Sequence, residues 1–308
     1  MIYLNTPIFQ SPALNKALGK TVYFKMDCHQ PTRSFKIRGM AHLVQELAKS
    51  GRNQFVASSG GNAGYSLAYA CARLNALVHV VVPETSAAHM RNLIEGEGAT
   101  VEIFGQSWQE AHQHALKLAE ERQSYYVSPF DDQLLWAGHS TMIDECAAAI
   151  PEPDMVVAAV GGGGLLCGIM EGMERNGWKK AEFLAAETIG AASYDMAISA
   201  GKVVAMDAIN TIATSLGAKQ VATTAFEWSK KRTVKRHICD DFHAMSGVKS
   251  LLDAFNVLVE PACGAALSAV YSPKTDIEEA KSILVIVCGG AGLDTEGYIK
   301  HLKTFGIQ

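Results

Sequence analysis

The sequence predicts an α/β protein in which parallel β-sheets are covered by helices. First, short apolar runs alternate with helical repeats between residues 54 and 127, as they do where crossover helices join parallel strands. Second, the apolar run Val156–Val160 leads through four glycines into another helical repeat. Third, the apolar run Ile283–Val287 ends at a glycine-rich turn.

Composition limits the classes of function. The chain has 308 residues, 48% hydrophobic and 19% charged, so it can bury a large core in one large or two ordinary domains. A net charge of -4 without a basic run argues against nucleic-acid and membrane-surface partners. Residues 1–12 lack the pattern of a secretory signal. The stretch 155–170 is uncharged, but its four glycines favour a strand, a loop and a helix over a membrane span. Seven cysteines without a C-x-x-C pair indicate reduced thiols in a cytoplasmic protein.

The elements of the first half follow in order. Turns are predicted at Thr6-Pro7 and Ser11-Pro12, and residues 21–26 alternate as a strand does. The segment Ser34–Gly39 leads into a helix predicted over 40–49. The alternating region then gives strands at 55–58, 77–82, 100–104 and 125–127, with helices at 65–74, 87–95 and 108–122.

The second half gives fewer but clearer signals. The strand at 156–160 is followed by a helix that begins near Leu165, and Gly177 is a plausible stop for it. Residues 183–186 are predicted as a strand, and Pro261 fits the first turn of a further helix. The strand at 283–287 precedes one last helix.

The turn Gly161–Gly164 is suited to hold a phosphate. Its N–H groups can converge on an anion at a helix start, and no Cβ keeps the backbone away. The dinucleotide fingerprint fails here because Leu166 or Cys167 stands at the third glycine position, and Gly19–Thr21 lacks the first glycine of a nucleotide-triphosphate loop. Two alternatives stay open: a nicotinamide enzyme with Glu187 as the ribose-binding acid, and a glycine run that only permits close strand–helix packing.

Lys36 is a candidate nucleophile. It stands between Phe35 and Ile37 at a probable helix start, where the helix dipole disfavours a cation and burial lowers the pKa of an amine. A neutral amine in this place can attack an aldehyde and form an imine. The alternative is an ordinary solvated lysine in a basic cluster with Arg33 and Arg38.

A second loop, Ser59–Gly64, has the composition of an anion or carboxylate cradle. Asn62 can both donate and accept hydrogen bonds there. The alternative is a glycine turn that Asn62 merely caps. The sequence contains neither a G-x-S-x-G elbow nor an H-E-x-x-H motif, so conventional hydrolase signatures are absent.

Taken together, these segments resemble the serine/threonine dehydratase family of pyridoxal-phosphate enzymes, and in particular its liver-type serine dehydratases. The resemblance implies the two-domain tryptophan synthase β-like fold, fold type II. It also implies a large cofactor-binding domain of residues 1–38 plus 140–308 and a small domain, 39–139, that closes over the substrate. The matching segments span nearly the whole chain in the family's order: Ser34–Gly39, Ser58–Gly64, Gly138-His139, Gly161–Leu165, Glu187–Ser193, Glu260–Ala266 and Val287–Gly290.

The resemblance implies roles for the site residues. Lys36 would hold pyridoxal 5'-phosphate covalently and later remove the α-proton, and Cys288 would face the ring nitrogen without giving it a full proton. Taken alone, Cys288 would be interpreted as a small buried hydrophobe. The other cofactor contacts would be Phe35 at the ring, Asn62 at the 3-hydroxyl, and Gly161, Gly162, Gly163, Gly164 and Leu165 at the phosphate. The substrate carboxylate would be held by Ser59, Gly60, Gly61, Asn62 and Ala63.

The activity that the resemblance implies is α,β-elimination of L-serine, with L-threonine as second substrate, to a 2-oxo acid and ammonia. Family members are commonly homodimers. A β-replacement enzyme of the same fold, as in cysteine or cystathionine synthesis, stays open as an alternative. So does a protein that binds a phosphate ligand without catalysis.

Three further features come from the resemblance. A monovalent-cation site, expected to bind potassium, would use Glu187, Ala191, Ser193, Leu216 and Ala218, although Glu187 alone could be a surface acid at a strand end. Gly60 stands where many relatives have alanine or serine, which argues against racemisation and predicts room for substrates bulkier than serine. Ser215 stands where the closest relatives have alanine, and no role is predicted for its hydroxyl.

Overall fold

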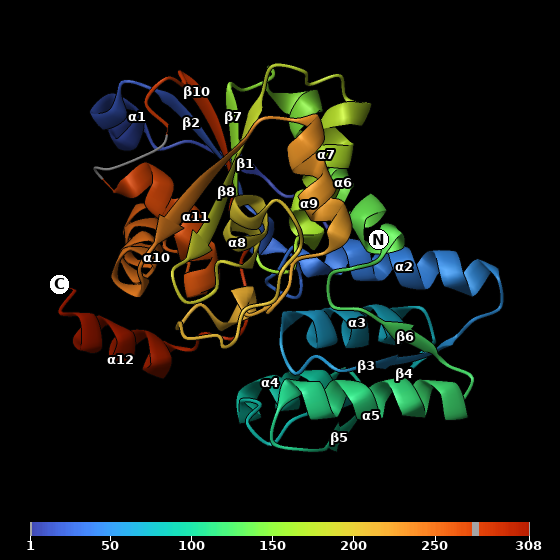
Figure 1. Ribbon diagram of the computed structural model, residues 1–308. Coiled ribbons are helices and arrows are strands. Elements are labelled where there is room, and N and C mark those ends of the chain that lie inside the picture. Colours follow the sequence, from blue (N-terminus) through green and yellow to red (C-terminus); the bar gives the residue numbers. More distant parts are fainter. Residues whose placement is uncertain (1, 273–276, 308) are drawn as a thin grey trace.

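The computed structural model describes residues 2–272 and 277–307, and these form two separate β-sheets (Figure 1). The larger sheet has six strands in the order β1-β2-β10-β7-β8-β9, and the smaller has four in the order β5-β4-β3-β6. Every neighbouring pair is parallel except β1–β2. The predicted parallel-rich α/β class is therefore confirmed.

The six-stranded sheet contains the most deeply buried strands. Its strands are β1 (Ile8–Phe9), β2 (Thr21–Lys25), β7 (Met155–Ala159), β8 (Glu182–Thr188), β9 (Val234–Cys239) and β10 (Ser282–Ile286). β10 pairs with β2 on one side and β7 on the other, and its residues 283–286 are fully shielded from solvent. A central parallel strand covered on both faces must be apolar throughout, which explains the continuous run in the sequence.

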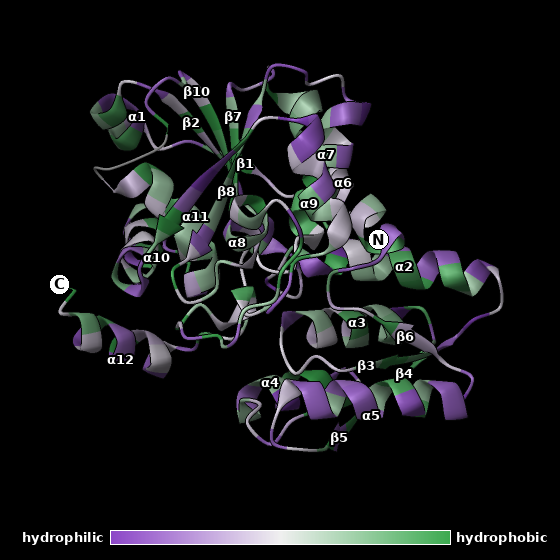
Figure 2. Cartoon of the chain, in the orientation of Figure 1, coloured by the Kyte–Doolittle hydropathy of each residue, from purple (hydrophilic) through white to green (hydrophobic). Residues whose placement is uncertain are grey.

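The four-stranded sheet alternates its side chains between two layers. It comprises β3 (Gln54–Ala57), β4 (Leu77–Val82), β5 (Thr100–Ile103) and β6 (Tyr125–Val127). Val80 and Val82 of β4 join the main core, whereas Val81 packs into a separate cluster with α5 (Trp108–Glu121). In Figure 2 the outward side of α5 is mostly hydrophilic. The other helices of this sheet are α3 (Asn62–Arg73) and α4 (Ala88–Gly96).

Helix α2 (Lys36–Lys49) crosses between the two sheets (Figure 1). It packs on α6 (Gln133–Ala149), which in turn packs on α7 (Gly164–Arg175). The approach of α2 to α6 is so close that a Cβ on Gly39 would lie 2.4 Å from the His139 ring, and one on Gly138 would lie 2.4 Å from the Arg38 carbonyl oxygen. Glycine at these two positions thus sets where the first residue of α2 lies between the sheets.

Most predicted elements form within one to three residues of their expected bounds, and the differences have physical causes. Ser11-Pro12 begins a helix, α1 (Pro12–Leu18), and not a turn, because the Ser11 hydroxyl accepts from the Leu14 N–H and Pro12 occupies the first helical position. The predicted helix 40–49 begins at Lys36. The helices and strands without a prediction are β1, α6, β9, α8 (Ser193–Ala200), α9 (Thr223–Lys231) and α10 (Asp241–Phe255). Helices α11 (Pro261–Tyr271) and α12 (Thr295–Phe305) agree with the sequence.

Two bulk predictions can also be compared with the structure. All seven cysteines are free and buried, as predicted for reduced thiols. Within residues 2–272 and 277–307, none of the helices combines the length and the apolar character needed to cross a bilayer.

Candidate active site

The turn Gly161–Gly164, called here the tetraglycine turn, lies between β7 and α7 and has close neighbours wherever a Cβ would point. A Cβ on Gly162 would lie 2.3 Å from the Phe130 ring, and one on Gly164 would lie 2.5 Å from the Phe130 carbonyl oxygen. Gly163 has φ +92°, and its Cβ would lie 2.4 Å from the Ala225 methyl group. Close packing therefore requires these glycines, as the packing alternative states.

The same turn also presents free donors. Among the described residues, none accepts a hydrogen bond from the backbone N–H groups of Gly161, Gly162 or Gly163. Gly164 and Leu165 open the 12-residue helix α7, whose first N–H groups have no partner within the helix. This arrangement has the donors and the dipole that a phosphate requires. Packing and anion binding are thus two properties of one turn.

Lys36 is the first residue of α2, as its place near a helix start predicts. Its Nζ donates to the carbonyl oxygen of Pro129 at 2.5 Å and lies 5.1 Å from the centroid of the Phe35 ring. Burial lowers the pKa of Lys36 from 10.5 to about 8. The alternative of an ordinary solvated lysine is therefore wrong, and the lowered pKa favours a nucleophilic amine.

Backbone contacts bring four distant segments together around Lys36. Pro129 accepts from Lys36, and the adjacent Phe130 packs on the tetraglycine turn. The Phe35 N–H donates to the Cys288 carbonyl oxygen at 3.0 Å, so the end of β10 also lies at the start of α2. Lys36, the tetraglycine turn and Cys288 therefore line one place in the fold.

Cys288 is a neutral thiol in this structure. It is 6% exposed, and a hydrogen bond with the Cys263 thiol, together with burial, raises the pKa of Cys288 well above its usual value. A neutral thiol can make one weak hydrogen bond but cannot act as a counter-ion. This agrees with the expected partner that leaves a ring nitrogen without a full proton.

The segment Ser59–Ala63, called the Ser59 loop, forms the second cradle at the start of α3. None of the described residues accepts from the N–H groups of Gly60, Asn62 or Ala63, and Gly61 donates to the Ser59 hydroxyl at 3.4 Å. A Cβ on Gly64 would lie 1.9 Å from the Ser59 carbonyl oxygen, so the turn requires glycine there. The loop offers donors at a helix start, as a carboxylate site needs.

Asn62 does more than cap this turn. Its Oδ1 accepts from the Ala291 N–H at 2.8 Å, and its Nδ2 donates to both carboxylate oxygens of Glu260 at 3.0 Å. Nδ2 also lies 3.4 Å from the Ser215 hydroxyl. The Asn62 side chain therefore reaches from the four-stranded sheet to loops that follow strands of the larger sheet. It makes no capping hydrogen bond to α3, so the capping alternative is wrong.

The structure corrects the expectation for Gly60. A Cβ on Gly60 would lie 2.6 Å from the Ser86 hydroxyl oxygen and 3.1 Å from a Val82 methyl group. The space left by the missing side chain is thus filled by β4 and the loop after it, and it does not give a substrate more room.

The five residues predicted for a cation occupy two turns. Glu187 is fully buried at the end of β8, where its two oxygens accept from the N–H groups of Tyr194 and Asp195 at 2.9 and 2.8 Å. Burial raises the pKa of Glu187 to about 8, so the surface-acid alternative is wrong. Ser193 Oγ is buried without a hydrogen-bond partner among the described residues.

The second cation turn adjoins the tetraglycine turn. The Leu216 carbonyl oxygen accepts from the Ala218 N–H at 2.7 Å, and a Cβ on Gly161 would lie 3.1 Å from the same oxygen. Ala191 forms a short turn with Thr188 after β8, through an N–H···O bond of 2.8 Å. An unpartnered hydroxyl beside a buried carboxylate fits a monovalent cation, which oxygen atoms coordinate.

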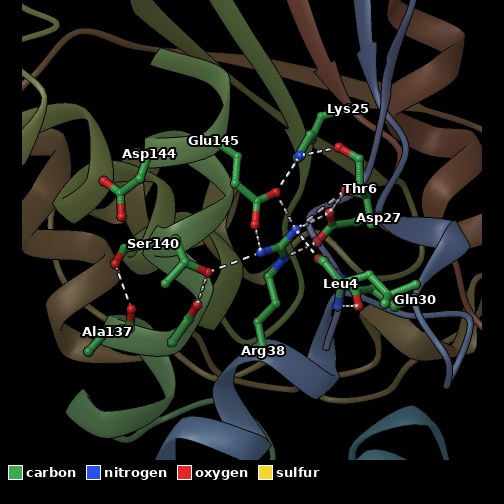
Figure 3. Close-up of polar contacts among 12 residues, drawn as sticks. Leu4, Thr6, Lys25, Asp27, Gln30, Arg38, Ala137, Ser140, Asp144 and Glu145 are labelled. Carbon is green, nitrogen blue, oxygen red and sulfur yellow. Dashed lines mark hydrogen bonds and ion pairs between the residues drawn. The ribbon is translucent and has the colours of Figure 1, made fainter. Parts of the chain in front are cut away.

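A buried cluster of charges around Arg38 fixes the first turn of α2 (Figure 3). The guanidinium donates to Asp27 from Nε at 2.7 Å and from Nη2 at 2.9 Å, and to Glu145 at 2.7 and 2.8 Å. Lys25 donates to Glu145 at 2.5 Å, and Thr6 to Asp27 at 2.6 Å. Since Arg38 is fully buried, it does not belong to a solvated basic cluster.

Sequence reasoning missed several residues of this site. The carbonyl oxygen of Pro129 and the ring of Phe130 carry no chemical signature, so no pattern could have indicated them. His139 belongs to a matching segment, and its ring lies 4.8 Å from that of Phe35. Glu260 was noted as the residue before a helix-starting proline and as the first residue of a matching segment, but no role was predicted for its carboxylate.

Lys36, an amine of lowered pKa, thus lies near the tetraglycine turn at the strand ends of an α/β fold, an arrangement that suits an enzyme with a phosphate-bearing aldehyde cofactor. The comparisons agree. The chain belongs to the pyridoxal-phosphate dependent enzyme family, whose profile matches residues 1–289.

Relatives and solved structures of similar length extend this result. The human protein "serine dehydratase-like" is 41% identical, over 97% of this chain and 93% of the relative. Human "L-serine dehydratase/L-threonine deaminase" is 40% identical, over 95% and 92%. The crystal structure of a fungal L-serine ammonia-lyase from Rhizomucor miehei superposes with a TM-score of 0.91 and 31% identity, over 99% of each chain.

Proposed function

We propose that the protein is a pyridoxal-phosphate-dependent ammonia-lyase that deaminates L-serine, and L-threonine as a second substrate, to pyruvate or 2-oxobutanoate and ammonia. The observation that carries the proposal is the position of Lys36, whose amine has a pKa of about 8 and lies where the tetraglycine turn and Cys288 meet. The names of the relatives above, L-serine dehydratase/L-threonine deaminase and L-serine ammonia-lyase, support the same reaction.

The cofactor contacts follow from the donors of the site. The N–H groups of Gly161–Gly164 and Leu165 would hold the phosphate, and Phe35 would cover one face of the ring. Asn62 would donate to the 3-hydroxyl, and the Cys288 thiol would meet the ring nitrogen. When bound, the cofactor supplies a ring that withdraws electrons from the substrate α-carbon, and a thiol partner moderates this effect in favour of elimination.

The protein's own groups then perform binding and proton transfer. The Ser59 loop would hold the substrate carboxylate with the hydroxyl of Ser59 and the N–H groups of Gly60, Gly61, Asn62 and Ala63. Lys36 would take the proton from the α-carbon at Nζ, which its lowered pKa permits near neutral pH. A positioned general base of this kind contributes roughly 10²–10⁴-fold to the rate.

The two sheets provide the frame for domain closure. We propose a large domain of residues 1–38 plus 140–308 and a small domain of 39–139, with the site between them. The Ser59 loop belongs to the small domain and the tetraglycine turn to the large one, so closure would bring the substrate carboxylate toward the cofactor.

We propose that potassium binds at Glu187, Ala191, Ser193, Leu216 and Ala218. The unpartnered Ser193 hydroxyl and the buried Glu187 carboxylate support this proposal. Activity should fall when potassium is replaced by a bulky organic cation, and Glu187→Gln should lower the apparent potassium affinity. Equal activity in both buffers would remove the cation from the proposal.

We propose further that the protein is a cytoplasmic homodimer. Four large apolar side chains, Ile189, Met196, Ile238 and Phe242, are exposed around the ends of β8 and β9, and a second copy could cover them. The reduced state of all seven cysteines supports the location. Light scattering on the purified protein decides the oligomeric state.

Two measurements test the activity. Borohydride reduction of the purified protein, followed by peptide mapping, should place the cofactor on Lys36, and Lys36→Ala should abolish the adduct. A keto-acid assay over a panel of amino acids, with and without an added thiol, should give pyruvate from L-serine. A thioether product would indicate β-replacement, and an adduct on another lysine would refute the assignment.

A further inference from the structure

Glu260 has no role in the proposed chemistry, yet its carboxylate is one of the most fully bonded groups of the site. It stands directly before α11 and is 5% exposed, but its side chain does not bond to the start of that helix. It turns instead toward Asn62, Ser215 and the loop that follows β10.

Every contact of this carboxylate is with a donor. Ser215 Oγ lies 2.6 Å from Oε2, the Gly292 N–H 2.5 Å from Oε1, and Asn62 Nδ2 3.0 Å from each oxygen. The loop makes room for it, because a Cβ on Gly290 would lie 2.1 Å from Glu260 Cδ and one on Gly292 would lie 2.6 Å from Oε1. These glycines shape the loop around the carboxylate.

The donors and acceptors around Asn62 allow only one orientation of its amide. Oδ1 faces the Ala291 N–H, while Nδ2 faces the Glu260 carboxylate. A half-turn of the amide would set its NH₂ group against an N–H donor and its carbonyl oxygen against a carboxylate, and both contacts would be repulsive. Because Nδ2 is equidistant from the two carboxylate oxygens, one N–H can serve both. The second N–H has only the long contact of 3.4 Å with the Ser215 hydroxyl, which a ligand oxygen can replace.

We propose that Glu260 is a positioning residue that acts through Asn62. Together with Ser215 it fixes the Asn62 amide and ties the start of α3 to loops that follow strands of the larger sheet. The proposal rests on the proposed function only for the ligand of the free Asn62 N–H, which is the phenolic oxygen of the cofactor. It also gives the Ser215 hydroxyl a role, because this hydroxyl is one of the donors that hold the Glu260 carboxylate.

The experiment compares Glu260→Gln with Glu296→Gln, the same change at an exposed residue of α12. The amide that Glu260→Gln introduces would present an NH₂ group to donors, so we expect the cofactor dissociation rate to rise about ten- to hundredfold, as the loss of a charge-assisted hydrogen bond implies. Amide hydrogen exchange over residues 58–66 should also become about tenfold faster, with and without cofactor. Ser215→Ala should change both quantities in the same direction but less.

A double-mutant cycle distinguishes positioning from a general structural effect. If Glu260 acts through Asn62, the Glu260→Gln/Asn62→Ala variant releases cofactor no faster than Asn62→Ala alone. Additive effects, or exchange that rises over the whole chain and not over 58–66, would overturn the proposal. Should Glu260→Gln fail to fold, faster local exchange in Asn62→Ala still tests the tie between α3 and the larger sheet.

The outcome is separable from that of the proposed function. If the wild-type protein released no keto acid, the lyase activity would be refuted, but exchange over 58–66 would still decide whether Glu260 holds Asn62. Conversely, a fully active Glu260→Gln variant with unchanged exchange and cofactor release would leave the lyase intact and overturn the role of Glu260.

Discussion

Replacing Arg38 by methionine should destabilise the protein by about 3–5 kcal/mol, the range for removing one partner from a buried ion pair. The guanidinium uses all five of its N–H donors on Asp27, Glu145 and Thr141, at 2.7 to 3.1 Å. Without it, the fully buried Asp27 keeps one donor, the Thr6 hydroxyl, and Glu145 keeps Lys25. The remaining cluster then has an uncompensated negative charge in a low-dielectric surrounding.

Urea unfolding measures this loss. With a dependence of about 3 kcal/mol per molar urea for a chain of this length, the midpoint should fall by about 1 to 1.7 M. The matched control is Arg175→Met, because Arg175 pairs with Asp144 on the surface, where the two side chains are 48% and 40% exposed. A surface pair contributes below about 1 kcal/mol, so this control should move the midpoint by less than about 0.3 M.

The comparison of the two arginines can refute the reasoning. If Arg38→Met and Arg175→Met shifted the midpoint equally, the buried cluster would contribute no more than a surface pair. A second check is the Asp27→Asn/Arg38→Met variant, which removes one charge of each sign and should regain part of the lost stability. A double variant less stable than Arg38→Met would contradict the charge argument.

Three further outcomes are expected. Because the pKa of Lys36 is about 8, the rate at which cofactor-free protein couples to an aldehyde should rise about tenfold per pH unit up to pH 8 and then stay constant. Trapping the imine with borohydride measures this rate. A rate that still rises steeply above pH 9 would contradict the lowered pKa. Gly64→Ala should displace the Ser59 loop and raise KM for serine far more than Gly61→Ala does, because a Cβ on Gly61 meets only the Ser59 hydroxyl at 4.0 Å. Similar KM values for the two variants would contradict the assignment of the Ser59 loop to the substrate carboxylate. Gly162→Ala should push Phe130 aside and speed cofactor release, which the loss of visible absorbance measures. An unchanged release rate would contradict the proposal that the tetraglycine turn holds the cofactor phosphate.

The strands could be predicted because burial on both faces leaves a strong signal. β4 and β10 are apolar over nearly their whole length, and their bounds differ from the prediction by at most one residue. The long helix α6 gave no such signal. It lies between α2 and α7, so apolar residues surround it and no amphipathic stripe marks its sequence. β9 is an edge strand with exposed charged residues, and α9 is similarly polar, which explains why both were missed.

The site was predictable where function requires an unusual residue type. Four glycines in a row are rare enough to be noticed. A lysine between apolar neighbours is common, so the role of Lys36 was predicted only through the family resemblance. Residues that act through common chemistry were not: Pro129 contributes only a carbonyl oxygen, and Glu260 is one of many acids. Their partners lie 93 and 198 residues away in the chain, so only the fold reveals them.

The Arg38 cluster raises the question of why an enzyme would bury four charges next to the first residue of α2, Lys36. Buried ion pairs are often no more stabilising than apolar side chains of the same volume, so stability alone does not explain the cluster. A guanidinium held by two carboxylates is directional, however, and it fixes both the rotation and the axial position of the first turn of α2. The Lys36 amine depends on that position for its contact with Pro129 and for the burial that lowers its pKa. The Asp27→Leu/Arg38→Met variant could therefore regain stability and still lose the aldehyde reactivity near pH 8; if it kept both, the directional role of Arg38 would be refuted.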